Sequence, residues 1–259
     1  MDRGFVPFEF DLPGALLEQL IVVLDDMYDE RLTAAHVSQI PDAQGVYQLF
    51  LDGRLVYVGK TDAQAGLRKR LLRHATKILG RPSLLDHAVT YKAVQVLVFT
   101  AMDLETALIE HYKKSGAPPA WNGSSFGSND PGRLRETTNK KPDGFDQSYP
   151  ISIDQEDAFL AVGKYTVADA LTCLKRELPY TLRYETDVRK GRSHSSWHHG
   201  DLQNATIEVS GKRHTVRSLL VQFVNALPGG WQATVFSSHV ILYKETGTYT
   251  YGEAIRKPA

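Results

Sequence analysis

The sequence predicts a mixed α/β protein (α+β), with a small central sheet flanked by helices in its first part and an α/β domain in its second. Three observations predict this class. Two apolar, strand-like runs flank the pair Asp52–Gly53, which is typical of a hairpin turn. Apolar residues recur at helical spacing on both sides of that hairpin. A stretch rich in Gly, Ser, Asn and Pro over residues 122–150 then separates the two parts.

The composition is that of an ordinary globular protein. Hydrophobic residues make up 42% of the 259 and charged residues 23%, which excludes a disordered or collagen-like chain. Thirty basic residues balance thirty acidic ones, so a nucleic-acid site would need a local concentration of charge. Cys173 is the only cysteine, which excludes an internal disulfide and a cysteine-rich zinc motif. Because no long apolar run and no signal-peptide pattern occur, we expect a cytoplasmic protein that does not bind a membrane.

Periodicity and turn signals give the expected elements of the first part. Helices are predicted over 13–32, 67–79 and 103–114, and strands over 46–51, 55–59 and 93–101. Gly116 and Pro118 end the last of these helices. The expected domain division is an N-terminal helical extension over 1–40, a first domain over 41–135, a linker over 136–150 and a second α/β domain over 151–259.

Two similar segments in the second domain suggest a tandem duplication. Thr166-Val167 and Thr215-Val216 are each followed by a leucine four residues after the valine, and by Leu-Pro eleven residues after it. A threonine N-cap, a helix of about three turns and a proline stop account for this spacing. We therefore predict two strand–helix–strand units whose apolar helix faces pack on one shared sheet; the alternative is chance recurrence of helix caps. Strands are predicted over 180–184, 205–209, 232–236 and 239–243.

Two tripeptides on the predicted hairpin carry the main chemical signal. Gly45-Val46-Tyr47 begins the first strand, and Tyr57-Val58-Gly59 lies in the second, with Tyr57 ten positions after Tyr47. Together with the motifs described next, this pattern resembles the GIY-YIG nuclease superfamily. The resemblance implies a GIY-YIG-type sheet and hydrolysis of phosphodiester bonds in double-stranded DNA with one divalent metal, Mg²⁺ or Mn²⁺.

The predicted helix over 67–79 carries the second motif. Arg70 and His74 lie one turn apart on one face. The opposite face is formed by Leu67, Leu71, Ala75 and Ile78. The resemblance implies that Arg70 contacts the scissile phosphate, a role that suits the fixed fork of a guanidinium, and that His74 belongs to the restriction-enzyme branch. For an isolated run, the alternative interpretation is a solvated basic face.

The third motif is Glu105, followed by Leu108-Ile109, which is similar to the metal-binding segment of the superfamily. One carboxylate can hold a Mg²⁺ ion whose shell is completed by water and phosphate oxygens. Glu110 is the alternative ligand, because this chain carries several extra residues before Asn122. Asn122 resembles the terminal asparagine of the superfamily, which implies that its side chain ties loops of the site together.

The stretch from Phe126 to Arg133 reads Phe-Gly-Ser-Asn-Asp-Pro-Gly-Arg and is similar to the type II restriction endonucleases of this superfamily. The resemblance covers residues 45–135 and stops there. It implies that Tyr47 acts as general base, with relay of the proton to His74, provided that a nearby cation lowers the tyrosine pKa. It also implies that Tyr57 and Lys60 orient the water or the phosphate. Because one site cuts one strand, cleavage of both strands predicts a homodimer.

Charge along the chain agrees with a DNA-binding groove. Between residues 60 and 81, seven basic residues are opposed only by Asp62, which gives 7 − 1 = +6. The basic residues are Lys60, Arg68, Lys69, Arg70, Arg73, Lys77 and Arg81. The expected DNA contacts outside the chemistry are Arg68, Lys69, Arg73, Lys77, Asn129 and Arg133.

Three functional classes therefore stay open from the sequence. The first is a restriction-type or defence endonuclease. The second is a defence or mobile-element effector nuclease of low sequence specificity that a partner regulates through residues 151–259. The third is a non-catalytic DNA-binding module. The histidines over 194–199 show no usual zinc spacing, so a solvated loop is expected there.

Overall fold

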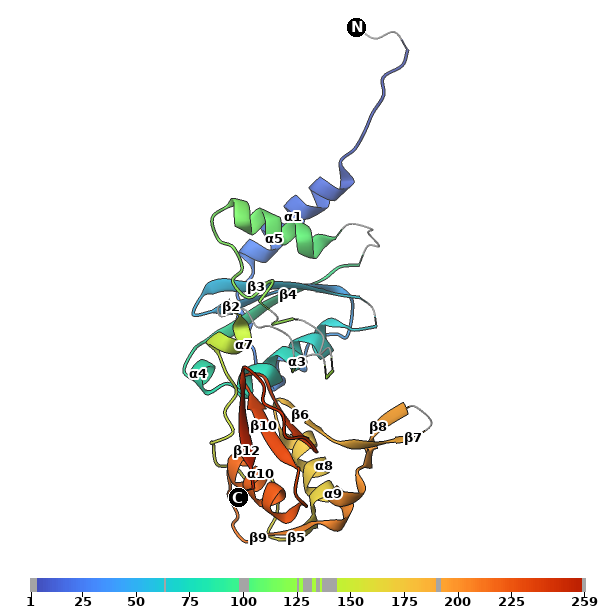
Figure 1. The fold of residues 1–259 in the computed structure, drawn as a ribbon. Helices are drawn as coiled ribbons and strands as arrows, with labels where there is room; N and C mark the ends of the chain where they lie inside the picture. The colour runs from blue at the N-terminus through green and yellow to red at the C-terminus, as the bar shows by residue number, and fades with distance from the viewer. Residues whose placement is uncertain are drawn as a thin grey trace. The chain divides into compact units, whose positions relative to one another are not determined.

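The computed structural model describes residues 4–62, 64–97, 103–124, 126–127, 132–133, 136, 144–189 and 192–257. The chain divides into two compact units, one formed by 1–75 and 87–127 and the other by 76–86 and 128–259 (Figure 1). Both units combine helices with small sheets, so the mixed α/β class is confirmed. In the described part of the chain, none of the helices is long and apolar enough to cross a membrane.

The first unit is built on a four-stranded antiparallel sheet in the order β1-β4-β2-β3. The strands are β1 Glu30–Arg31, β2 Gly45–Leu51, β3 Arg54–Thr61 and β4 Val89–Gln95. The predicted hairpin joins β2 to β3. Its turn residues Asp52 and Gly53 have φ angles of 49° and 77°, the left-handed pair that matches the twist of the strands.

Helices cover both faces of this sheet. Alternation along β2 sends Val46 to one face and Tyr47 to the other. Val46 packs with α1 (Leu12–Asp26) and α5 (Leu104–Lys114). Tyr47 faces α3 (Leu67–Leu79), whose apolar positions predicted from the sequence are all buried. A short helix, α2 (Ala34–Val37), precedes β2.

Two expected elements of the first unit differ from the structure. The helix predicted over 13–32 ends at Asp26, because Glu30 and Arg31 pair with Tyr91 and Thr90 at the sheet edge. The strand predicted over 93–101 is shifted, since β4 runs from Val89 to Gln95 and residues 98–101 lie outside the described part of the chain. Pairing with all seven residues of β2 fixes this register, which no periodicity in the apolar run could specify.

In its described part, the second unit contains one four-stranded sheet, β12-β10-β11-β6, and two antiparallel strand pairs, β5-β9 and β7-β8. Its helices are α4 Pro82–Leu85, α7 Phe145–Ser148, α8 Val167–Glu177, α9 Gly200–Asn204 and α10 Val216–Ala226. Its strands are β5 Gly163–Thr166, β6 Thr181–Tyr184, β7 Thr186–Arg189, β8 Arg192–His198, β9 Thr206–Val209, β10 Gln232–Phe236, β11 His239–Tyr243 and β12 Gly252–Arg256.

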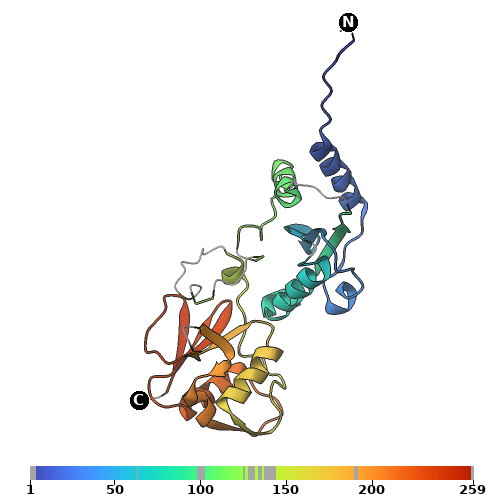
Figure 2. The same ribbon diagram turned by 90° about the vertical axis from the view of Figure 1, so that its right-hand side faces the viewer.

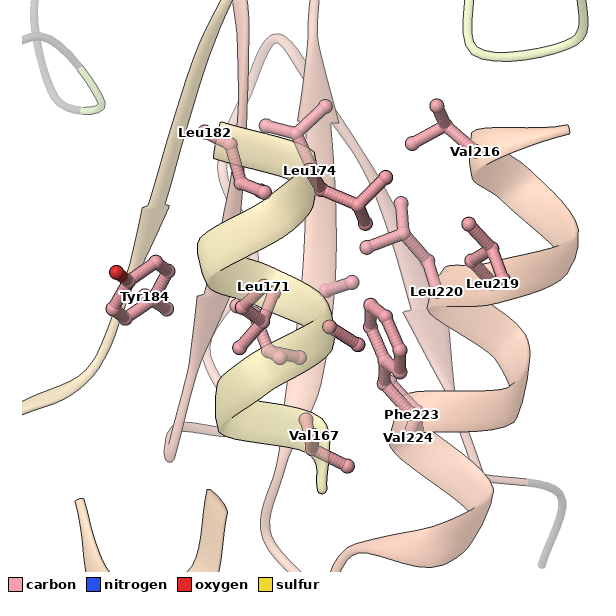
Figure 3. Close-up of a cluster of buried hydrophobic side chains, with 14 of the residues drawn as sticks. Val167, Leu171, Leu174, Leu182, Tyr184, Val216, Leu219, Leu220, Phe223 and Val224 are labelled. Carbon is pink, nitrogen blue, oxygen red and sulfur yellow. The ribbon is translucent and has the colours of Figure 1, made fainter. Parts of the chain in front are cut away.

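The two Thr-Val segments form matching helices, as predicted. Thr166 and Thr215 each accept a hydrogen bond from the backbone three residues ahead, and each helix has eleven residues. Their inward faces share one core (Figure 3). All eight predicted positions are buried, namely Val167, Leu171, Leu174, Leu178, Val216, Leu220, Phe223 and Leu227. The shared sheet is only partly correct, because β9 pairs with β5 in a sheet of its own.

Part of the expected linker and part of the expected histidine loop form a helix and a strand of the second unit. Arg81, only 1% exposed, donates hydrogen bonds to the Tyr149 carbonyl and to Asp146, which lies in α7. Residues 76–86 therefore group with the second unit although they precede β4 in the chain. The histidine cluster expected in a loop lies largely in β8, where the His198 ring stacks on Tyr184.

Candidate active site

Tyr47 is the centre of the candidate site. It is fully buried on the α3 face of the sheet, opposite Gly59 in the β2–β3 ladder. A Cβ atom at position 59 would collide with the Tyr47 ring, so the glycine of the second tripeptide makes room for the tyrosine of the first. The Tyr47 hydroxyl lies 2.8 Å from Nε2 of His74. The two tripeptides, Gly45-Val46-Tyr47 and Tyr57-Val58-Gly59, therefore pack directly against each other.

His74 lies inside the protein and not on a solvated helix face. It is 1% exposed, and its ring stacks on Phe126 with centroids 4.6 Å apart and planes inclined by 12°. The Tyr57 ring packs against both rings, with its centroid 5.5 Å from that of His74 and 5.1 Å from that of Phe126. Sequence reasoning did not single out Phe126 as a site residue. Its place in the restriction-type stretch was the only signal.

Arg70 joins the tyrosines to the segment around Phe126. Its Nε donates a hydrogen bond to the Tyr47 hydroxyl at 3.3 Å, and its Nη2 donates to the Gly127 carbonyl at 2.9 Å. Arg70 and His74 lie one turn apart on the same face of α3, as the spacing predicted, and both contact the same phenol oxygen. The Gly127 carbonyl is a second contact that the sequence did not reveal.

The electrostatics correct one expectation about Tyr47. Burial raises the pKa of its hydroxyl well above the ordinary value, the nearby Tyr57 raises it further, and the hydrogen bond from Arg70 opposes this only in part. Burial likewise raises the pKa of Tyr57, with a contribution from Glu105. Arg70 therefore offsets the effect of burial on the pKa of Tyr47 only in part, whereas a lowered pKa was expected from a nearby cation.

Glu105 lies in the first turn of α5 and points toward β3. Its Oε2 accepts a hydrogen bond from the backbone N–H of Lys60 at 3.2 Å. Burial raises the pKa of the half-buried carboxyl, while the positive charges of Lys60 and Arg70 act in the opposite direction. Glu110 instead forms an exposed ion pair with Lys113 at 2.8 Å. Of the two acidic candidates, Glu105 is the one that lies beside the tyrosines and Arg70.

The donor set at Glu105 fits a metal that takes most of its ligands from water and substrate. Only one carboxylate oxygen of Glu105 accepts a hydrogen bond from the described residues. In that part of the chain, no group of three His, Cys, Asp or Glu side chains is arranged to hold a metal ion. A closed structural site is therefore absent there, whereas a hard cation held by one carboxylate and by phosphate oxygens remains compatible with these residues.

Lys60 contacts two acidic residues at the start of α5, one through its side chain and one through its backbone. Its ammonium group lies 2.8 Å from Oδ1 of Asp103, the N-cap residue of α5, in an ion pair that is about half exposed. The ammonium thus pairs with an acidic side chain of the protein, while the Lys60 backbone binds Glu105. Sequence reasoning began the predicted helix at Asp103, a preferred N-cap residue type, but did not single out this residue as part of the site.

Asn122 lies in the turn that follows α5 and fastens this turn to the outer edge of β3. Its Oδ1 accepts from the Val58 N–H at 2.9 Å, and its Nδ2 donates to the Val58 carbonyl at 2.8 Å. The Trp121 N–H adds a bond of 2.7 Å to the Val56 carbonyl. The side chain of Asn122 thus replaces a strand partner for the residue between Tyr57 and Gly59, which agrees with the role implied by the resemblance.

Replacing Asn122 by alanine is expected to lower the free energy of unfolding by about 1–3 kcal/mol, because both polar backbone groups of Val58 lose their partner. Urea denaturation measures this change. The matched control is Gln19→Ala, which removes an exposed amide from α1 and should change stability by no more than about 0.5 kcal/mol. Equal effects of the two substitutions would contradict a stabilising role for the two hydrogen bonds between Asn122 and the Val58 backbone.

The charge expected for the DNA-binding groove is reduced by acidic residues from distant parts of the sequence. Arg68 and Lys69 both pair with Asp42, at 3.7 and 3.1 Å. Lys77 lies 3.9 Å from Asp146, which also binds the buried Arg81. The value of +6 counted along the chain is therefore too high as a description of the surface, since Asp42, Asp103 and Asp146 lie among these cations.

The remaining predicted DNA contacts are divided between the two units. Arg73 is exposed on α3. Arg133 belongs to the second unit, where it pairs with Glu185 at 2.8 Å and lies over the Tyr243 ring. Asn129 lies outside the described residues.

Comparison with known proteins adds no family assignment. No protein-family model matches the chain, and no curated protein sequence matches it.

Proposed function

We propose that the first unit is a metal-dependent DNA endonuclease of GIY-YIG type that hydrolyses phosphodiester bonds. The observation that carries the proposal is the convergence of Arg70 and His74 on the buried Tyr47 hydroxyl, with Tyr57 and Glu105 beside them. These residues come from β2, β3, α3 and α5, and a purely structural core has no need for five polar or charged groups at one point.

The phenol of Tyr47 and the imidazole of His74 form a two-step path for a proton. Because burial keeps Tyr47 protonated, its hydroxyl can accept the proton of an attacking water only as it passes its own proton to His74, 2.8 Å away. Stacking on Phe126 holds the imidazole in place for that transfer. Tyr57, whose ring centroid lies 6.0 Å from that of Tyr47, would orient the water or the phosphate.

Arg70 supplies positive charge beside the same hydroxyl. A guanidinium half removed from water interacts more strongly with a phosphoryl oxygen than an exposed one does, since the local dielectric constant is lower. Glu105 would hold Mg²⁺ or Mn²⁺ together with water and phosphate oxygens. When bound, that ion supplies stabilisation of charge on the phosphate and on the leaving oxygen.

The assignment to a restriction-type or defence nuclease is a narrower proposal. It rests on His74, on the stretch around Phe126, and on a second unit in which none of the proposed catalytic residues lies. A partner-regulated effector nuclease and a non-catalytic DNA-binding module are the alternatives. The arrangement of Tyr47 and Arg70 is compatible with all three functions. The three are therefore distinguished by what the protein does to DNA.

Incubation of the full chain with supercoiled plasmid and Mg²⁺ is the decisive experiment. We expect conversion to nicked and linear DNA, with no conversion in EDTA. Discrete fragments would identify a restriction-type enzyme, and progressive degradation would identify an effector of low specificity. A gel shift without cleavage in Mg²⁺ and in Mn²⁺ would overturn the proposed chemistry in favour of the binding module.

A further inference from the structure

A segment of the first unit exposes aromatic side chains that the unit does not cover. Every described residue from Gly4 to Pro13 is exposed, and Phe5, Phe8 and Phe10 have exposed fractions of 78%, 87% and 62%. Figures 1 and 2 show this segment running away from the start of α1. Single exposed apolar residues are normal, but three phenylalanines within six residues form a surface that a folded protein normally buries.

The same unit contains an uncovered sheet edge beside an apolar groove. Strand β1 pairs with β4 only at Thr90 and Tyr91, so the outer edge of β4 over residues 92–95 has no strand partner in the described part of the chain. A groove of about 480 Å³ lies along this edge. Its apolar lining is formed by Met27, Ile40, Pro41, Leu67 and Tyr91. An open edge with a neighbouring apolar groove is the arrangement that accepts an added strand.

We propose that residues 5–11 of one copy of this protein dock along the β4 edge and in the adjoining groove of a second copy, which produces an arm-exchanged homodimer. The segment has the pattern this requires. In an extended segment Val6, Phe8 and Phe10 project to one side, and Phe5, Pro7 and Glu9 project to the other. The groove would accommodate an extended apolar peptide, and residues 5–11 of this protein are such a peptide.

Chain length favours a second copy over docking within the same copy. The segment is joined to the first residue of α1, whereas the groove begins at Met27, just beyond the last residue of that helix. Fifteen helical residues span about 22 Å, and seven extended residues span about 23 Å. A segment that turned back along its own helix would use its whole length to reach the groove and have none left to occupy it. A second copy meets no such limit.

Exchange also explains why both features occur in one unit. Each copy offers one segment and one groove, so a two-fold pair buries the Val6, Phe8 and Phe10 side of each segment together with each groove. The proposal does not depend on nuclease activity, because the segment and the groove contain none of the proposed catalytic residues. Its test measures mass and cross-linking and gives the same answer whether or not the protein cleaves DNA.

Sedimentation velocity over a concentration series tests the dimer. We expect the full chain to reach twice its 28.9 kDa mass. The double substitution Phe8→Ser and Phe10→Ser should weaken association by about tenfold or more for each side chain. At concentrations where both proteins are monomeric, the melting temperature should be unchanged. Val162→Ser removes a comparably exposed apolar residue from the second unit and should leave association unchanged. A monomer at all concentrations, or a dimer that survives the double substitution, would overturn the proposal.

Cross-linking distinguishes this contact from any other dimer. In a Cys173→Ser background, one preparation carries Phe10→Cys and another carries Gln39→Cys, an exposed position beside the groove. Mild oxidation of the mixture should give disulfide-linked pairs in high yield, and neither preparation alone should. Efficient cross-linking of either preparation with itself, or none in the mixture, would show that the segment lies elsewhere.

Discussion

Replacing Glu105 by glutamine should reduce the rate of DNA cleavage by about a thousandfold or more while DNA binding is preserved. The substitution removes the charged metal ligand and keeps an oxygen that can accept the Lys60 N–H. The fold should be at least as stable as before. Because burial raises the pKa of Glu105, its ionised form is disfavoured in the folded state, and a neutral amide removes that cost.

The control for this substitution is Glu110→Gln on the same helix. Glu110 is exposed and pairs with Lys113, so its replacement should leave cleavage within about twofold and stability within about 0.5 kcal/mol. Single-turnover cleavage of a labelled duplex, with thermal denaturation of each variant, measures both effects. If Glu110→Gln is the inactive variant, the metal ligand lies further along α5 and the assignment of Glu105 is wrong.

Replacing Arg70 by alanine should lower the cleavage rate at saturating DNA by about 10²–10³-fold. The side chain lies half-buried between the Tyr47 hydroxyl and the Gly127 carbonyl, where it can act on charge that develops on the phosphate. Arg70→Lys keeps the charge and loses the planar fork, so an intermediate rate is expected.

Arg73→Ala is the matched control on the same helix. Arg73 is exposed, and its loss should weaken DNA binding and reduce the salt dependence of binding, with little change in the rate at saturation. Rates measured at saturating DNA separate the two effects, and filter binding at several salt concentrations gives the slope. Equal losses of turnover in the two variants would show that Arg70 is a peripheral contact and not part of the chemistry.

Local signals in the sequence determined the hairpin and the main helices. Asp52–Gly53 sets the β2–β3 turn because the required φ angles are positive at both positions. The helices α3, α5, α8 and α10 begin and end within one or two residues of their predicted bounds, because caps and apolar spacing are properties of neighbouring residues. The same locality let Arg70 and His74 be placed together, since both lie on one helix.

Only the tertiary structure decided contacts between residues far apart in the chain. Pairing with β4 drew Glu30 and Arg31 out of the predicted helix, because a sheet edge outweighs weak helix propensity. Asp42 and Asp146 reduced a charge that had been counted along the sequence, because an ion pair depends on distance in space. The pKa of the Tyr47 hydroxyl likewise depends on the tertiary structure. This pKa depends on how completely the fold removes the hydroxyl from water, and no residue type or spacing records that quantity.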